Sequence, residues 1–444
     1  MIKTINKYQL LEFLCIFIIT MMFNLICVSM NHDEIWNYGF AYNIASGLIP
    51  YKDFNMIITP LSPLLNAIFM MLLGKNIITL HIINSIICTC IFFFMKKNYS
   101  KCYYIIYAIF LFYSLPNYNI LCLLLLYILI DIENIKGNDF IIGLLIGLIF
   151  ITKQNIGIYL LIPSIITNIK NFKSLLNRCC GFIIPIIILI VYLICTNSFY
   201  NFIDYCFLGI NDFAKKNLSI NYIYLTVLIL SIIYIIWQYI KTKKNIFLYL
   251  LFYSFISFPI IEDYHVMLAF IPAFGFFLSN LNLNKRIISY AFILFITIIF
   301  SINIYTIHTE EFKYPNITNQ YKFRRLNNSD AKSIELVSNY ISEIDERLYT
   351  ISSTAYLIKL ESNKQINKYD LLNNGNLGKN GAKKLINEIK NNCQKEKCVF
   401  LVDITDTYKP ELTQFNQEII HYIINNYNDY GNLYNYELKI YKNY

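Results

Sequence analysis

The hydrophobic pattern of this chain consists of long apolar runs separated by short polar turns. Runs such as Phe182–Cys195 and Ile287–Ile307 are nearly free of charge. At ~1.5 Å per helical residue, runs of this kind can cross the ~30 Å hydrocarbon layer of a membrane. The pattern therefore predicts a polytopic α-helical membrane protein with about eleven transmembrane helices, at residues 9–30, 76–95, 102–115, 117–132, 139–152, 154–170, 179–196, 220–240, 246–260, 264–281 and 287–307.

The composition agrees with this interpretation. Apolar residues make up 57% of the chain and charged residues 15%, whereas a soluble protein of 444 residues would carry more charge on its surface. The net charge of +9 does not indicate nucleic-acid binding, because the bases gather in particular loops between the apolar runs. We expect membrane lipid as the surroundings and no nucleic-acid partner.

The distribution of bases predicts the orientation in the cell membrane. Alternate loops are basic and the loops between them are not, as the positive-inside rule requires when the N-terminus is cytoplasmic. The basic loops hold Lys96, Lys97, Lys101, Lys136, Lys170, Lys173, Arg178, Lys241, Lys243, Lys244, Lys285 and Arg286. The C-terminal region is then extracytoplasmic.

The composition turns polar at about residue 308. We therefore divide the chain into a transmembrane domain at 1–307 and a small extracytoplasmic α/β domain at 308–444. In the second domain, Leu348–Ile351 and Cys398–Val402 read as short buried strands. Cys393 and Cys398 lie close in sequence, and we expect them to approach each other. A disulfide and a pair of free thiols both fit this spacing.

The first outer loop, residues 31–75, is the most unusual polar segment. A helix between Asn31 and Gly47 would place Ile35, Tyr38 and Tyr42 on one face, which predicts an amphipathic helix on the membrane surface. A second helix should begin near Pro60 or Pro63 and end near Gly74. Asp33 at the start of the loop is a candidate functional residue, because ionisable groups are rare at such depths; the alternative is a partner of the helix dipole. Glu34 fits either a capping box or a functional role.

Two further outer turns contain polar residues at the ends of apolar runs. The first contains Lys153 and Gln154, where the alternative is a lysine that extends its charged end to the interface. The second contains Tyr264 and His265, where the alternative is an ordinary polar helix cap. Because all three polar clusters fall on the outer side, they predict one outward-facing site.

These segments resemble the GT-C superfamily of membrane glycosyltransferases that use polyprenyl-phosphate sugars. The nearest likeness in pattern is to protein O-mannosyltransferases and the lipid A aminoarabinose transferase. The likeness covers roughly residues 1–310 and rests on His32-Asp33-Glu34, Gly47-Leu48-Ile49-Pro50-Tyr51-Lys52-Asp53, Pro60-Leu61-Ser62-Pro63, the Thr152-Lys153-Gln154 turn and the Tyr264-His265 pair.

The resemblance implies transfer of a sugar from a polyprenyl-phosphate donor to an extracytoplasmic glycan, lipid or protein. An inverting reaction of this kind needs one carboxylate base, for which Asp33 is the candidate and Glu34 the alternative. The implied substrate-binding residues are His32, Tyr51, Asp53, Lys153, Gln154 and His265. Asp53, with Asp33 and His265, is also a candidate ligand set for a divalent metal ion, and the sequence leaves metal dependence open. No arginine precedes residue 320 in the outer loops, so phosphate binding would depend on lysine, histidine and neutral donors.

Two other functions fit the same membrane pattern. A transporter or flippase for a lipid-linked sugar would be expected to show repeats and spans broken by glycine or proline near the midplane. The chain has 14 glycines and places its polar clusters at the surface. A surface-polysaccharide polymerase or ligase would be expected to use outer-loop arginines, which are scarce here.

Overall fold

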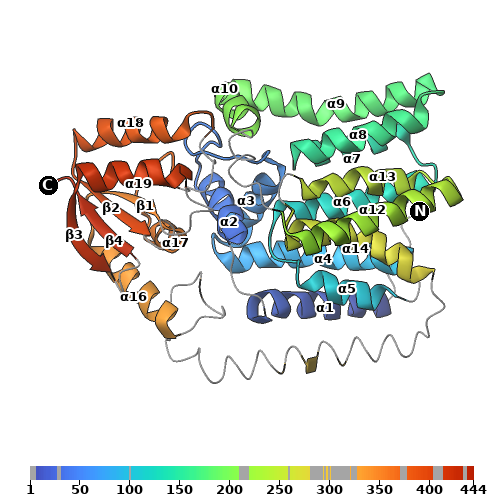
Figure 1. Ribbon diagram of the computed structural model, residues 1–444, viewed down its shortest axis with the longest axis horizontal. Coiled ribbons are helices and arrows are strands. Elements are labelled where there is room, and N and C mark those ends of the chain that lie inside the picture. Colours follow the sequence, from blue (N-terminus) through green and yellow to red (C-terminus); the bar gives the residue numbers. More distant parts are fainter. Residues whose placement is uncertain are drawn as a thin grey trace.

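A computed structural model describes residues 7–27, 32–99, 102–209, 220–258, 261–280, 294, 297–298, 301, 321, 328–370, 378–403, 414–433 and 438–444. A helical bundle occupies one end of the molecule and a small β-sheet with its helices occupies the other (Figure 1). Helices α2 (His32–Ala45) and α3 (Leu61–Leu73) lie between them. The first outer loop thus lies between the bundle and the sheet (Figure 1).

The bundle is built from the apolar runs, because a helix satisfies its own backbone hydrogen bonds within the hydrocarbon layer. The predicted breaks at Pro116 and Lys153 both occur. The helices are α1 (Lys7–Met22), α4 (Ile77–Asn98), α5 (Tyr103–Leu111), α6 (Tyr118–Asn134), α7 (Asp139–Phe150), α8 (Gln154–Asn168), α9 (Phe172–Cys195), α12 (Tyr222–Thr242), α13 (Ile246–Tyr253) and α14 (Asp263–Ser279), with π-helical turns at Phe23–Cys27 and Asp204–Leu208, a short α10 (Phe199–Ile203) and a 3-10 turn at Ser254–Ser257.

Four helices in the described part of the chain are long and apolar enough to cross a membrane. They are Lys7–Leu25, Ile77–Asn98, Phe172–Cys195 and Tyr222–Thr242. Other apolar helices, including α7 and α14, are shorter. The span predicted at 287–307 lies largely outside the described residues.

Helices α7 and α9 pack with their backbones almost in contact. A Cβ atom on Gly143 would lie 2.0 Å from the Arg178 carbonyl oxygen, and one on Gly181 would lie 2.1 Å from the Phe140 carbonyl oxygen. Gly147 extends the same close approach one turn further along α7, to the carbonyl oxygen of Phe182. Such small residues let helices approach closely where no hydrophobic effect drives association.

The helix predicted after Asn31 forms as α2, but it is not a helix with one apolar face on the membrane surface. Besides Tyr38, its polar residues Glu34, Asn37 and Asn43 are buried, so α2 is covered on several sides. The coverage comes from α3 and from α17 (Ser353–Glu361) of the C-terminal region. Hydrophobic periodicity therefore predicted the helix correctly, but the prediction that it lies on the membrane surface was wrong.

The C-terminal region contains a four-stranded mixed sheet in the order β1-β2-β4-β3. Strands β1 (Arg347–Ile351) and β2 (Cys398–Asp403) are parallel and form at the predicted apolar runs. Strands β3 (Asn428–Leu433) and β4 (Leu438–Lys442) extend the sheet in antiparallel pairs. Helices α16 (Asn328–Glu343), α17, α18 (Gly381–Cys393) and α19 (Gln414–Asn426) accompany the sheet (Figure 1).

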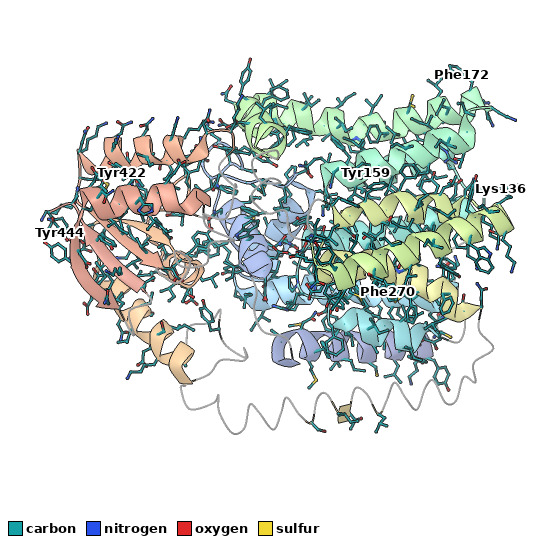
Figure 2. All side chains as sticks on the ribbon, viewed as in Figure 1. Lys136, Tyr159, Phe172, Phe270, Tyr422 and Tyr444 are labelled. Atoms are coloured by element: carbon teal, nitrogen blue, oxygen red, sulfur yellow. A yellow bond between two sulfur atoms is a disulfide. The ribbon has the colours of Figure 1, made fainter. Side chains whose placement is uncertain are left out.

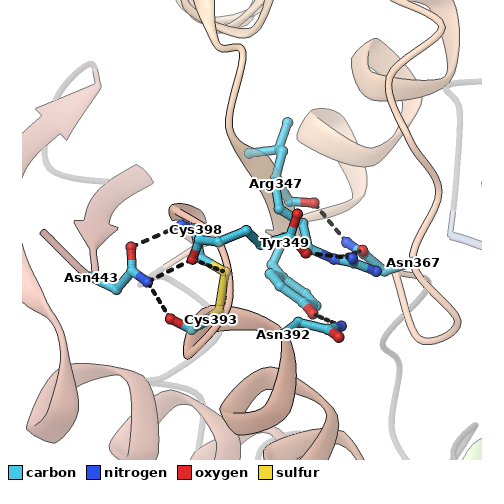
Figure 3. Close-up of a disulfide and its surroundings, with 9 residues drawn as sticks. Arg347, Tyr349, Asn367, Asn392, Cys393, Cys398 and Asn443 are labelled. Atoms are coloured by element: carbon cyan, nitrogen blue, oxygen red, sulfur yellow. Dashed lines mark hydrogen bonds and ion pairs between the residues drawn. A yellow bond between two sulfur atoms is a disulfide. The ribbon is translucent and has the colours of Figure 1, made fainter.

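A disulfide joins Cys393 at the end of α18 to Cys398 at the start of β2, with 5.5 Å between the Cα atoms (Figure 3). The expectation that these two residues approach each other is therefore confirmed. Asn443 closes the same corner by donating to the Cys393 carbonyl and accepting from the Cys398 N–H. The bond fixes the turn that leads from α18 into β2, one of the two inner strands of the sheet.

The C-terminal region holds the first outer loop through buried hydrogen bonds. The Tyr42 hydroxyl donates to the Leu360 carbonyl at 2.9 Å, and the Asn55 N–H donates to the Lys368 carbonyl at 2.9 Å. Gly39 gives room for the Tyr356 ring, whose hydroxyl oxygen would be 2.6 Å from a Cβ at this position. The position of α2 therefore depends on residues some three hundred positions later in the chain.

The close contact of α7 with α9 generates a prediction. Gly143→Leu should lower the thermal unfolding midpoint of the detergent-purified protein, because overpacking a filled contact costs about 1–3 kcal/mol. Ile141→Leu is the matched control, since Ile141 on the same helix is 40% exposed on the bundle surface. Equal midpoints for the two variants would contradict the packing described here.

Candidate functional site

Asp33 lies in the first turn of α2, at the junction of the bundle and the outer segments. Its carboxylate lies within electrostatic range of Lys153, Glu262 and His265. Burial raises the pKa of the Asp33 carboxyl above its usual value, and Glu262 adds to the rise. His265, Lys153 and a hydrogen bond from Asn117 oppose it. These four partners come from the starts of three later helices, so the bundle brings separate turns to one place.

Asn117, in the turn between α5 and α6, supports both a helix and the candidate carboxylate. Its side-chain oxygen caps α6 by accepting from the Asn119 N–H at 2.9 Å. Its amide nitrogen donates to Asp33 Oδ2 at 2.7 Å. A neutral donor of this kind stabilises the ionised form of Asp33 without adding a charge.

Hydrogen bonds of the Ser114 carbonyl and hydroxyl hold the turn between α5 and α6 in place. The Ser114 hydroxyl donates to Asn24 Oδ1 at 2.8 Å, and the Ser114 carbonyl accepts from the side chains of Asn24 and Asn84. The π-helical turn at Phe23–Cys27 brings Asn24 to this position. These contacts fix the α5–α6 turn relative to α1 and α4, and Asn117 follows three residues later.

Lys153 enters the site from the turn between α7 and α8. Its ammonium group donates to Asn119 Oδ1 at 2.9 Å and lies 5.5 Å from the centroid of the Tyr118 ring. Burial lowers the pKa of Lys153 to about 8, while Cys122, Asp33 and Glu262 oppose the change. The group therefore lies among Asn119, Tyr118 and Asp33, a placement that differs from the alternative of a lysine extended to the interface.

The third turn supplies His265 and Tyr264 at the start of α14. His265 Nδ1 lies 2.9 Å from Glu262 Oε1, a spacing of three residues in the sequence. The Tyr264 hydroxyl lies within electrostatic range of Asp33 and Tyr118. Within the described residues, this buried hydroxyl and the buried Asn119 Nδ2 lie near each other, and neither forms a hydrogen bond of good geometry. Two buried donors of this kind beside Lys153 suit an anionic ligand.

Glu34 points away from this group despite being the next residue. It is fully buried, and its Oε1 lies 2.5 Å from His81 Nε2 on α4, which is also fully buried. The contact joins α2 to the bundle and differs from a capping box, in which the carboxylate would turn back to the helix start. Neighbouring acids thus have different surroundings, because consecutive side chains on a helix point about 100° apart.

Three more of the predicted residues hold the fold together at other places. Gln154 Nε2 donates to the Cys206 carbonyl at 2.9 Å. The Tyr51 hydroxyl donates to the Ile58 carbonyl at 2.7 Å from a fully buried position. Asp53 Oδ2 accepts from the Ile49 N–H at 2.7 Å and closes the turn around Pro50. The side chain of His32 lies outside the described part of the structure.

The structure therefore brings together Asp33, Lys153 and His265 with its neighbour Tyr264, and adds Asn117, Tyr118 and Asn119 to them. The sequence carried a signal for the added turn: Asn117-Tyr118-Asn119 is a polar triplet directly after Pro116, at the start of an apolar run. In the described residues, no group of three or more His, Cys, Asp or Glu side chains has the arrangement of a metal site.

Comparison with known proteins supports the fold. No protein-family model matches the chain, and no curated protein matches it by sequence. Several solved structures match the chain, among them two that cover almost its whole length. ArnT from Cupriavidus metallidurans bound to undecaprenyl phosphate has a TM-score of 0.56 and 11% identity, and covers 99% of this chain and 98% of its own. The apo form of the same protein has a TM-score of 0.57 and 10% identity, with 98% of each chain covered. The chain thus shares the fold of an aminoarabinose transferase of the GT-C type, as the sequence motifs predicted.

Proposed function

We propose that this protein is a membrane glycosyltransferase that transfers a sugar from a polyprenyl-phosphate donor to an extracytoplasmic acceptor. The observation that carries the proposal is the convergence of Asp33, Lys153 and His265. It occurs in a chain whose fold matches a protein solved with undecaprenyl phosphate. The acceptor would be a cell-envelope glycan, lipid or protein.

Asp33 is the proposed general base. In an inverting transfer, the acceptor oxygen forms a bond to the anomeric carbon as the bond from that carbon to the phosphate oxygen breaks. The acceptor proton passes to Asp33, and the polyprenyl phosphate leaves with the electron pair of the broken bond. Burial moves the pKa of Asp33 upward, toward the pH at which the enzyme works, which makes a carboxylate a better base. Glu34, paired with His81, is the less suitable candidate.

The leaving phosphate gains negative charge, and the proposal assigns Lys153 and His265 to face it. Their charges are supplemented by the buried donors of Tyr264 and Asn119. This set accounts for phosphate binding without an arginine. The Glu262 carboxylate, 2.9 Å from His265 Nδ1, would hold the imidazole in place beside this set.

The proposed topology has about eleven spans, a cytoplasmic N-terminus and the domain of residues 308–444 outside. A polyprenyl tail stays in the lipid while its phosphosugar remains at the interface, so a site at the outer surface suits this donor. The hydrogen bonds of Tyr42 and Asn55 to the C-terminal region support a role for that region in covering the site or binding the acceptor.

The first prediction from the proposed function concerns the general base. Asp33→Asn should lower sugar transfer from a polyprenyl-phosphate donor by about 10²–10⁴-fold, because it keeps the size and removes the proton acceptor. Donor binding, followed separately, should change little. Glu34→Gln is the comparison and should affect thermal stability more than the transfer step. Near-normal transfer by Asp33→Asn would remove it as the base.

The second prediction uses the pH dependence. Asn117→Ser keeps a cap for α6 but is too short to donate to Asp33. The Asn117 hydrogen bond lowers the pKa of Asp33, so its loss should raise that pKa and move the acidic limb of the pH–rate profile to higher pH. Asn138→Ser is the matched control, because Asn138 caps α7 with the same spacing, from its side chain to the Phe140 N–H. A shift in both variants, or in neither, would argue against the assignment.

The third prediction tests the orientation. In intact cells, a cysteine introduced by Asp330→Cys should react with a thiol reagent that cannot cross the membrane. A cysteine introduced by Lys243→Cys should react only after the membrane is permeabilised. The unaltered protein gives the background from the native cysteines. Labelling of the Lys243→Cys protein in intact cells would reverse the orientation.

A further inference from the structure

A polar cavity of about 450 Å³ lies at the end of the bundle remote from the C-terminal sheet. Three turns meet around it: the turn between α6 and α7, the turn between α8 and α9, and the turn between α12 and α13. Its lining consists of Glu133, Asn134, Lys136, Gly137, Asp139, Asn168, Asn171, Ser174, Arg178, Lys243, Lys244, Asn245 and Ile246. Figure 2 shows Lys136 at this end and Tyr444 at the other.

Both carboxylates of the cavity are already engaged by its deepest cation. Arg178 is 5% exposed and lies 3.0 Å from Glu133 Oε2 and 2.8 Å from Asp139 Oδ1. The Arg178 guanidinium also donates a hydrogen bond to the Tyr249 hydroxyl oxygen at 2.9 Å. Glu133 also accepts from Asn245 at 3.0 Å. The base of the cavity is therefore a network of paired charges that joins α6, α7, α9 and α13.

The three lysines of the cavity, unlike Arg178, are not paired with carboxylates of the part of the chain that the structure describes. Within the described residues, the ammonium groups of Lys136, Lys243 and Lys244 form no ion pair and no hydrogen bond, although Lys243 lies 5.7 Å from the Tyr239 ring centroid. Four cations against two carboxylates leave the cavity positive. Lys136 and Lys243 also have φ angles of 50° and 55°, at turn positions that favour glycine or asparagine. Lysine occupies both places despite that preference.

Exposed apolar residues, here called the apolar rim, adjoin the cavity lining in the sequence. Ile135 and Ile169 are each 69% exposed and Phe172 is 75% exposed, and each adjoins a lining residue in the sequence. A positive polar cavity beside exposed apolar side chains matches a molecule with an anionic head and hydrocarbon chains.

We propose that this cavity binds the phosphate group of an anionic ligand, and that its apolar rim selects a phospholipid over a soluble phosphate. Lys136, Lys243 and Lys244 would contact the phosphate oxygens, while Asn134, Asn168 and Asn171 offer neutral donors to the rest of the headgroup. Basic pockets between membrane helices bind anionic headgroups in this manner. The site is separate from Asp33 and does not depend on the proposed transferase activity.

The test uses the full chain purified in detergent and titrated with dioleoyl phosphatidylglycerol or dioleoyl phosphatidylcholine, with bound lipids counted by native mass spectrometry. The triple variant Lys136→Gln/Lys243→Gln/Lys244→Gln removes the cavity charges. The matched control Lys170→Gln/Lys173→Gln/Lys241→Gln removes three nearby charges that do not line the cavity. Thermal midpoints of both variants show that they remain folded.

The cavity variant should lose affinity for phosphatidylglycerol by roughly tenfold or more relative to the control, because each basic residue at an anionic surface strengthens binding about fivefold. Phosphatidylcholine should bind both variants equally. Equal losses in the two variants would mean that diffuse charge attracts the lipid, and would overturn the proposal, as would no loss in either. Competition by inorganic phosphate alone at the same three lysines would support the phosphate chemistry and overturn the preference for lipid.

Discussion

The cost of placing a charge at the edge of a hydrocarbon layer is the constraint on which this structure depends. A half-buried carboxylate such as Asp33 is tolerated only where opposite charges and hydrogen-bond donors compensate for lost water. Here the compensation comes from helix starts, where the chain turns and polar side chains can enter without breaking a helix. Asn117, Lys153 and His265 each follow or begin such a turn. The site therefore lies where the starts of several helices meet.

The same constraint separates the two acids of the first outer helix. Asp33 has a mixed environment of one carboxylate, two basic side chains and an amide, and these groups shift its pKa in opposite directions. Glu34 forms a fully buried contact with His81 and holds α2 against α4. A carboxylate engaged in a buried structural pair is a poor proton carrier, because changing its charge would disturb the packing around it. The proposed catalytic role and the structural contact thus fall to adjacent residues.

The sequence predicted the helices of the bundle well, because unbroken apolar runs and their breaks at Pro116 and Lys153 are local features. It also indicated Asp33, Lys153 and His265, since a chain that avoids charge rarely places ionisable residues at the ends of its apolar runs without a use for them. It was wrong about the surroundings of α2, which are decided by Tyr356 and Leu360, and periodicity does not reveal partners so distant in sequence. Gln154, Tyr51 and Asp53 have the residue types of a binding site, but each makes a short-range or backbone contact that no pattern distinguishes from ligand binding.

The contact between α2 and the C-terminal region also has a consequence for biosynthesis. Tyr42 and its acceptor Leu360 are 318 residues apart, so the ribosome completes the partner of α2 long after α2 has left it. At roughly 5–20 residues per second, the interval is on the order of tens of seconds. During that time the buried polar face of α2, with Asn43 and the hydroxyl of Tyr42, has only water or lipid headgroups beside it. The nascent chain would therefore finish inserting its spans before the outer segment closes, and a chain truncated before α17 would retain a bundle with an uncovered first loop.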